Sequence, residues 1–182
     1  KGNKIIVESG AGEKSFNSNL EYEKIGAEIK SRTEVLEQAE ILLSIHPLLD
    51  DDFSKINSKI LLGVHQPLSN GENVIKSIER KLTTFSLDML PRTTRAQAMD
   101  VLSSQANIAG YKAVLLAANS YGRYFPMFMT AAGSIAPAKV LILGAGVAGL
   151  QAIATAKRLG AVVEVFDTRP AVKEEVMSLG AK

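Results

Sequence analysis

A glycine-rich turn between an apolar strand and a helix restricts the fold of this chain more than any other feature. The strand is predicted over Val140–Leu143, the turn covers residues 144–149, and the helix extends over Val147–Leu159. A second strand, Val162–Phe166, follows and is succeeded directly by Asp167. Strand, glycine turn, helix and strand in this order predict a βαβ unit with parallel strands.

The three glycines of the turn, spelled Gly144-Ala-Gly146-Val-Ala-Gly149, have separate steric tasks. Gly144 permits a tight turn, Gly146 lets the backbone approach a pyrophosphate, and Gly149 lets helix and strand pack closely. The helix N-terminus offers unpaired N–H groups to phosphates. Glycines also serve ordinary turns, so a tight turn without a ligand is the alternative. The register with both strands and an acidic residue favours nucleotide binding.

Asp167 indicates which nucleotide the turn would bind. A carboxylate at the end of the second strand accepts hydrogen bonds from ribose hydroxyls, and it would repel a 2′-phosphate. It therefore favours NAD(H) over NADP(H). Arg169 follows two residues later and is of the type that holds a 2′-phosphate, so it leaves the alternative cofactor open.

The first half of the chain alternates short strand-like and helix-like runs, which is typical of a parallel sheet covered by helices. The predicted strands are Ile5–Glu8, Ile41–Ile45, Ile60–Val64 and Leu82–Leu87, and the predicted helices are Leu20–Ile29, Asp51–Ile56 and Asn73–Lys81. We therefore expect an α/β protein with two Rossmann-like parallel-sheet domains joined by a long helix. Because few residues follow the second strand, we expect the second domain to be incomplete and the chain to be a fragment. Because Lys1 lies just before a predicted strand with no preceding element, we expect the fragment to be shortened at both ends.

The long helix is predicted over Gln97–Arg123, after Pro91 interrupts the alternating pattern. Small residues recur on one face of it, which would let a neighbouring backbone approach closely. They are Ala106, Gly110, Ala113 and Ala117. The helix is therefore interpreted as a domain connector or a packed interface. Gly133–Pro137 is predicted to be a loop, and a last helix is predicted to begin at Pro170 and to end before Gly180.

Polar residues cluster where the long helix begins. Gln97, Asp100 and Ser104 are spaced to share one helix face, and Arg92 lies in the preceding loop. Helical geometry slightly prefers Ser104 to Ser103 on that face. Two interpretations stay open: a ligand-binding face, or polar capping residues with a solvated arginine.

Composition excludes several classes of site. The formal net charge of +2, without clustered lysines and arginines, gives no reason to expect a nucleic acid partner or an anionic membrane. The chain has no cysteine, which excludes disulfides, cysteine nucleophiles and thiolate zinc sites. We predict no metal site.

Long stretches resemble a known family, the NAD(H)-binding domain (domain I of the alpha subunit) of proton-translocating NAD(P) transhydrogenases, in the alanine dehydrogenase/transhydrogenase superfamily. The stretches are Arg95–Val114, Phe125–Gly133, Pro137–Ala161 and Phe166–Pro170, with a looser match around residues 7–12. The resemblance implies a flavodoxin-like N-terminal α/β domain over residues 1–99 that lacks its first elements. It implies that residues 100–182 hold the connecting helix and the beginning of a Rossmann NAD(H)-binding domain.

The resemblance also implies site residues, and each expected residue type is present. Those at the nicotinamide end are Arg92, Thr93, Thr94, Gln97, Asp100 and Ser103, those at the glycine turn are Gly146 and Val147, and those at the adenosine end are Asp167, Thr168 and Arg169. They bind and orient the nucleotide, and none acts as a covalent catalyst. Later site elements of the family would lie beyond Lys182.

The implied activity is direct hydride transfer between NADH here and NADP⁺ on a partner domain, coupled to proton translocation. The implied partners are the NADP(H)-binding domain, the membrane domain and a second copy, and the fragment would be inactive alone. The implied location is a soluble domain on a membrane enzyme, at the cytoplasmic side of a bacterial membrane or the matrix side of the mitochondrial inner membrane.

Two rival functions remain. An alanine dehydrogenase-like enzyme would carry a substrate-binding lysine before a Glu-Pro pair, but this chain reads Ser44-Ile45-His46-Pro47 there. His65 lies near that family's catalytic histidine, although an isolated loop histidine is more commonly a surface residue. The other rival is a module that holds NAD(H) without chemistry. Sequence following Lys182 would discriminate between these functions.

Overall fold

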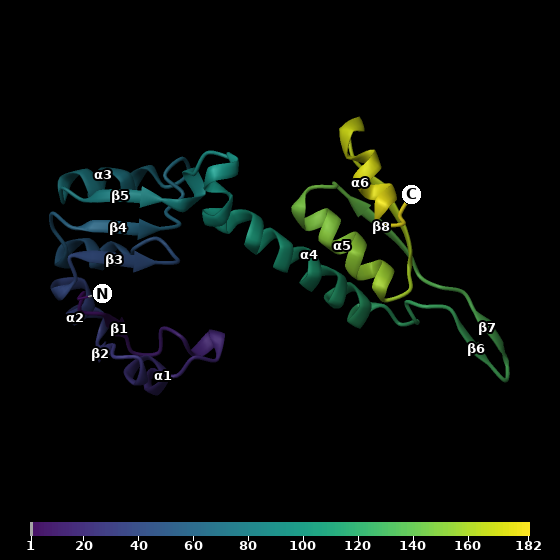
Figure 1. Cartoon of the computed structure of the whole chain (residues 1–182), viewed down its shortest axis with the longest axis horizontal. Coiled ribbons are helices and arrows are strands. Elements are labelled where there is room, and N and C mark those ends of the chain that lie inside the picture. Colours follow the sequence, from purple (N-terminus) through teal and green to yellow (C-terminus); the bar gives the residue numbers. More distant parts are fainter. Residues whose placement is uncertain (1) are drawn as a thin grey trace. The chain divides into compact units, whose positions relative to one another are not determined.

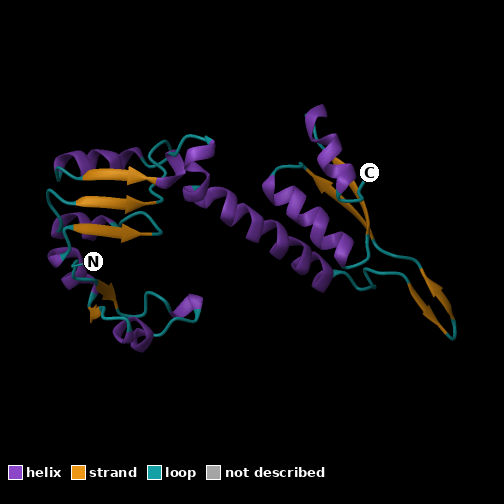
Figure 2. Ribbon diagram, viewed as in Figure 1, coloured by secondary structure: helices purple, strands orange, loops and turns teal. Residues whose placement is uncertain are grey.

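The computed structural model describes residues 2–182, and its contacts divide the chain into two compact units, residues 1–99 and 100–182 (Figure 1). Lys1, which belongs to the predicted N-terminal domain, lies outside the described residues. Both units combine helices with parallel strands (Figure 2), so the predicted α/β class is confirmed.

The first unit contains two groups of parallel strands. β1 (Ile6–Glu8) pairs with β2 (Glu28–Lys30). β3 (Ile41–Ser44), β4 (Ile60–Gly63) and β5 (Thr83–Ser86) form a sheet in that order. The α-helices are α1 (Asn19–Lys24), α2 (Arg32–Gln38) and α3 (Gly71–Glu79), and the 3-10 helices are η1 (Glu13–Ser15), η2 (Asp50–Lys55), η3 (Leu87–Met89) and η4 (Thr94–Met99).

One predicted helix of this unit is wrong. The run Leu20–Ile29 does not form a single helix, because α1 ends at Lys24 and residues 28–30 form β2. Gly26 lies between them with φ of +91°, a conformation that L side chains rarely adopt. The prediction also omitted α2, whose start is marked by a capping box between Ser31 and Glu34. The predicted helix Asp51–Ile56 is the 3-10 helix η2.

The core of the first unit lies on one face of the β3–β5 sheet, because residues on a strand alternate between its two faces. Leu42 of β3 and Leu61 of β4 pair with each other and are buried, whereas their neighbours Ile41 and Leu43 are exposed. Residues of α2 and of the segment around η2 complete this core: Leu36, Leu48, Phe53 and Ile56.

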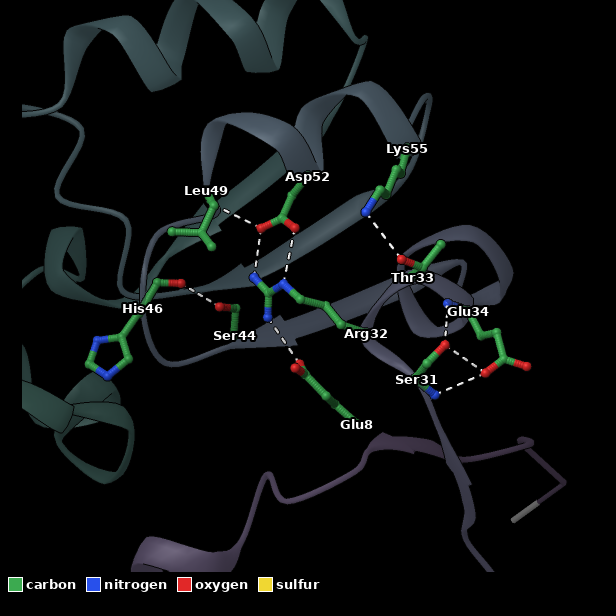
Figure 3. A network of polar contacts seen from close by, with 10 residues as sticks. All are labelled: Glu8, Ser31, Arg32, Thr33, Glu34, Ser44, His46, Leu49, Asp52 and Lys55. Atoms are coloured by element: carbon green, nitrogen blue, oxygen red, sulfur yellow. Dashed lines mark hydrogen bonds and ion pairs between the residues drawn. The ribbon is translucent and has the colours of Figure 1, made fainter.

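A charged network fixes three segments of the first unit around Arg32 (Figure 3). Nε and Nη2 of Arg32 donate to the carboxylate of Asp52 at 3.0 and 2.6 Å, and Nη1 donates to Glu8 at 3.0 Å. Asp52 is 2% exposed and also accepts from the N–H of Leu49 at 2.8 Å. Burial would raise the pKa of Asp52, but these hydrogen bonds outweigh burial and hold it below its ordinary value. The network joins the end of β1 to the starts of α2 and η2.

The second unit is built around one βαβ element. β8 (Lys139–Leu143) and β9 (Val162–Phe166) are parallel, and α5 (Val147–Arg158) connects them. The unit also contains α4 (Val101–Ser120), the antiparallel strands β6 (Phe128–Thr130) and β7 (Gly133–Ile135), the 3-10 helix η5 (Pro170–Val172) and α6 (Lys173–Ser178). The predicted loop Gly133–Pro137 is therefore partly wrong, since β6 and β7 form a hairpin. Lys182 exchanges backbone hydrogen bonds with Val163 and Val165 of β9.

Helices α4 and α5 approach each other closely at Gly110. A Cβ atom at Gly110 would lie 2.0 Å from the carbonyl oxygen of Ala148, so only glycine fits there. At Gly110, the predicted small-residue face thus packs against α5 of the same chain. Ala113 and Ala117 of that face are exposed. The predicted helix Gln97–Arg123 is shorter than expected, because α4 begins at Val101 and ends at Ser120.

The buried core of this unit surrounds α5. Ile153 and Ala156 are fully buried, and Val163 of β9 is 2% exposed. Among the described residues, no helix has both the length and the apolar character that crossing a bilayer requires.

Candidate functional site

The glycine turn at the end of β8 has the geometry that its sequence predicts. Gly144 has φ of +95°, and its N–H donates to the carbonyl oxygen of Phe166 at 2.8 Å. A Cβ atom at Gly149 would lie 1.8 Å from the carbonyl oxygen of Gly144, so helix and turn touch there. A Cβ atom at Gly146 would meet nothing within 4 Å. The turn therefore needs glycine for its shape at 144 and 149 and leaves open space at 146.

The N-terminus of α5 opens from this turn. Gly146 is the N-cap residue, and the first backbone bond of the helix is donated by Leu150 to Gly146 at 2.8 Å. The N–H groups of the first helical turn precede that bond and have no acceptor within the helix. Free N–H groups, the helix dipole and open space beside Gly146 fit a pyrophosphate.

Asp167 lies beside the turn, at the end of β9. Its Oδ2 accepts from the N–H of Ala145 at 2.7 Å, and its Oδ1 accepts from the N–H of Arg169 at 2.8 Å. The Arg169 guanidinium donates to both oxygens, through Nε at 3.1 Å and Nη2 at 3.0 Å. The Arg169 side chain, together with the two N–H groups, holds the pKa of Asp167 well below its usual range. The carboxylate is thus ionised and fixed next to the turn.

Sequence reasoning placed Asp167 and Arg169 near the adenosine end but did not find the bonds between them. The spacing Asp-x-Arg was the available signal. Thr168 lies between them and is exposed, and Val147 is exposed in the first turn of α5.

A cavity of about 500 Å³ borders this loop, within the size range of small-molecule sites. Its lining residues come from β9, the following loop and α6, and include Val165, Asp167, Arg169, Pro170, Val172 and Lys173. Carboxylate, guanidinium and ammonium groups therefore share one partly apolar cavity.

The sequence predicts that the polar residues at the start of α4 lie on one α-helix, but the structure places them on two helical segments. Asp100, with ψ of 81°, separates the 3-10 helix η4, which contains Gln97, from α4. The carboxylate of Asp100 accepts from the N–H of Ser103 at 2.9 Å and from its hydroxyl at 2.7 Å. The Ser104 hydroxyl donates to the Asp100 carbonyl oxygen, at 3.2 Å. Asp100 and Ser103 therefore cap α4, as the capping interpretation requires.

The other residues expected at the nicotinamide end lie in the first unit. Arg92, Thr93, Thr94 and Gln97 are all exposed, and buried Ala96 holds their segment by donating its N–H to the Thr93 carbonyl oxygen at 3.0 Å. Their proposed contacts with a nucleotide stay predictions.

His65, which the sequence suggested to be a surface residue, is buried in the structure with 8% exposure. Burial lowers its pKa, against the opposing charge of Asp88. Its backbone N–H donates to Ser86 Oγ at 3.1 Å and to Asp88 Oδ1 at 3.2 Å. It borders a cavity of about 380 Å³ with mainly apolar walls, and no sequence pattern indicated this environment.

Comparisons with known proteins place both units in one family. Residues 1–109 match the family model described as "Alanine dehydrogenase/PNT, N-terminal domain", and residues 113–182 match "Alanine dehydrogenase/PNT, C-terminal domain". The chain is 44% identical over 188 residues to an NAD(P) transhydrogenase subunit alpha protein of Rickettsia prowazekii, covering 100% of this chain and 49% of that protein. The chain thus spans about half the length of such relatives.

Solved structures agree with this assignment. The crystal structure of transhydrogenase from Sinorhizobium meliloti matches with a TM-score of 0.95 and 48% identity, over 100% of this chain and 55% of that chain. An L-alanine dehydrogenase matches with a TM-score of 0.79 and 23% identity, over 98% of this chain and 49% of that chain, which shows a shared fold. Since the two domain models together match nearly every residue, this chain belongs to the alanine dehydrogenase/PNT family.

Proposed function

We propose that this chain is the NAD(H)-binding component of a proton-translocating NAD(P) transhydrogenase. The observation that carries the proposal is the glycine turn with Asp167 fixed beside it, in a chain 44% identical to a transhydrogenase alpha subunit. Open space at Gly146 and the N-terminus of α5 suit a pyrophosphate, and a carboxylate at the end of β9 suits an unphosphorylated ribose.

The chain's own residues would bind and orient the nucleotide. The first turn of α5, with Val147, would hold the pyrophosphate, and Asp167, Thr168 and Arg169 would line the adenosine end, where Asp167 would accept from the ribose. Arg92, Thr93, Thr94, Gln97, Asp100 and Ser103 would orient the nicotinamide end. When bound, NADH supplies the hydride that passes directly to NADP⁺ on a partner domain, while a membrane domain couples this transfer to proton translocation.

Support for the orienting role comes from the local structure of these residues. The Asp100 carboxylate is fixed by its two bonds to Ser103, whereas Arg92 and Gln97 are exposed donors. Fixed polar groups limit the geometry of a reacting ring, and such positioning is the main way a protein accelerates transfer between two cofactors.

Nucleotide titration tests the proposal directly. We expect the 182-residue chain to bind NADH more tightly than NADPH by calorimetry. Asp167→Asn should weaken NADH binding by about tenfold, because a charged acceptor is lost. Glu164→Gln, which removes an exposed carboxylate from β9, the strand that Asp167 follows, should leave binding unchanged. Equal dissociation constants for the two nucleotides would contradict the proposal.

Hydride transfer tests the orienting groups. With the NADP(H)-binding domain of a relative added, Arg92→Ala and Gln97→Ala should slow transfer more than they weaken NADH binding. Gln105→Ala, an exposed glutamine of α4, is the matched control. A larger loss in binding than in rate would place Arg92 and Gln97 away from the reacting end.

The assembly is proposed from the family resemblance: a homodimer attached to the membrane enzyme, inactive as this chain alone. Because Gly110 packs against α5 within the chain, it is not available to a dimer contact. Light scattering at tens of micromolar, before and after adding the NADP(H)-binding domain, should show the dimer and the larger complex. A monomer under both conditions would contradict this assembly.

A further inference from the structure

The carboxylate of Asp167 accepts as many hydrogen bonds as its oxygens can hold. An ionised carboxylate has about four acceptor positions. Oδ1 accepts from the backbone N–H and from Nε of Arg169, and Oδ2 accepts from the N–H of Ala145 and from Nη2 of Arg169. A ribose therefore finds no free position on this carboxylate.

Two of the four donors can leave, and both belong to the Arg169 side chain. The N–H groups of Ala145 and Arg169 are part of the backbone beside the turn and cannot move without it. The Arg169 side chain is 59% exposed, whereas that of Asp167 is 9% exposed. Two ribose hydroxyls would thus replace the two guanidinium N–H groups, and the backbone bonds would stay.

We propose that Arg169 is a specificity-determining residue that competes with the ribose of NAD(H) for Asp167 and offers its guanidinium to the 2′-phosphate of NADP(H). The inference rests on the proposed function. NAD(H) has to displace the guanidinium from Asp167, so Arg169 weakens NAD(H) binding. A 2′-phosphate can instead pair with that guanidinium through two parallel bonds, which reduces its repulsion by Asp167. Arg169 therefore reduces the difference in affinity between NAD(H) and NADP(H).

The surroundings of Arg169 suit both roles. The hydrogen bond to Asp167, then the charge of Asp167 and finally that of Glu175 raise the pKa of Arg169, so the guanidinium stays charged. Glu175, near the start of α6, gives a displaced guanidinium a second carboxylate to interact with. The cavity beside this loop, which Arg169 and Lys173 both border, leaves room for the side chain to move.

Calorimetry with NADH and NADPH on the 182-residue chain tests this competition. Arg169→Ala should tighten NADH binding by about three- to tenfold, the range that one net hydrogen bond gives. It should weaken NADPH binding by about tenfold, because a charged partner of the phosphate is lost. Arg169→Lys should keep part of the NADPH affinity, since lysine preserves the positive charge but cannot donate the two parallel hydrogen bonds of a guanidinium. Arg158→Ala removes the same charge from the last turn of α5 and should change neither constant.

A nitrogen NMR measurement follows the displacement itself. The Nε–H signal of Arg169, assigned by its loss in Arg169→Ala, should shift when adenosine is added and should not shift with 2′,3′-dideoxyadenosine, which lacks both ribose hydroxyls. NADH binding that Arg169→Ala weakens or leaves unchanged would overturn the inference and preserve the proposed function. An NADPH dissociation constant that Arg169→Ala leaves unchanged would also overturn it. Failure of the chain and of every variant to bind either nucleotide would instead refute the proposed function and, with it, the inference.

Discussion

Two alanine substitutions in the glycine turn separate its structural task from its binding task. A Cβ atom at Gly149 would lie 1.8 Å from the Gly144 carbonyl oxygen, well short of the 3.4 Å at which ordinary contact begins. The obstacle is a backbone atom, so no side-chain rotation relieves it. Overpacking of this kind costs about 1–3 kcal/mol, and the better helix propensity of alanine returns up to about 1 kcal/mol. Gly149→Ala should therefore destabilise the second unit and also weaken NADH binding.

Gly146→Ala provides the contrasting result. A Cβ atom there meets nothing within 4 Å, and its φ of −80° suits any residue. Replacing a glycine N-cap by alanine costs about 0.5 kcal/mol. Stability should hardly change, but the methyl group would enter the space proposed for the pyrophosphate and weaken NADH binding by at least about tenfold, because the phosphates could no longer approach the helix N-terminus.

Urea denaturation followed by circular dichroism measures the stability of both variants, and calorimetry measures binding. Only Gly149→Ala should clearly lower the denaturation midpoint, whereas both variants should lose affinity. A stable Gly149→Ala chain would show that the close contact between helix and turn does not constrain the fold. Unchanged NADH affinity in Gly146→Ala would place the pyrophosphate elsewhere.

Two further predictions concern the fold. The folded-state pKa of Asp52 lies below its unfolded value, so its ionised form adds stability at neutral pH that is lost as the pH falls below about 4. Asp52→Asn should therefore lower the stability at pH 7 and make stability, measured by urea denaturation, depend less on pH in the acid range. An unaltered pH profile would show that the Arg32 network does not stabilise the fold. Gly110→Ala should separate α4 from α5 and lower the free energy of unfolding by about 1–3 kcal/mol. In the control Gly122→Ala, the added Cβ meets nothing within 4 Å, so the free energy of unfolding should hardly change. Equal denaturation midpoints for the two variants would argue against the close helix contact.

The βαβ element could be predicted from sequence because its signals are local. The strand Val162–Phe166 has the predicted bounds, and α5 begins at Val147 as expected and ends one residue early. Glycines with fixed steric tasks and an unbroken apolar strand leave few alternatives. The position of Asp167 beside the turn could be predicted because an acidic residue at the end of the second strand is part of the same pattern.

The errors arose where a short strand depends on a distant partner or where a side chain bonds to the backbone in place of a helical hydrogen bond. β2 is three residues long and pairs with β1, so only the pairing distinguishes it from the end of a helix. The break at Asp100 depends on its side chain bonding back to Ser103, which competes with a continuous helix. The burial of His65 likewise requires neighbours that no sequence pattern specified.

The close contacts at Gly110 and Gly149 limit how the cofactor preference of this chain could be redesigned. Ala148 and Gly149 are consecutive residues of α5; the carbonyl oxygen of the first fills the space beside Gly110, and the second lies against the Gly144 carbonyl oxygen. The backbone of the first turn of α5 thus contacts the backbone of α4 at Gly110 and that of the glycine turn at Gly144, and neither contact leaves room for a methyl group. A library that varies this turn should therefore keep Gly149, since a side chain there would meet a backbone atom. Diversity introduced at Arg169, Val172 and Lys173, which follow β9 and border the cavity, would sample new nucleotide preferences without changing these two backbone contacts.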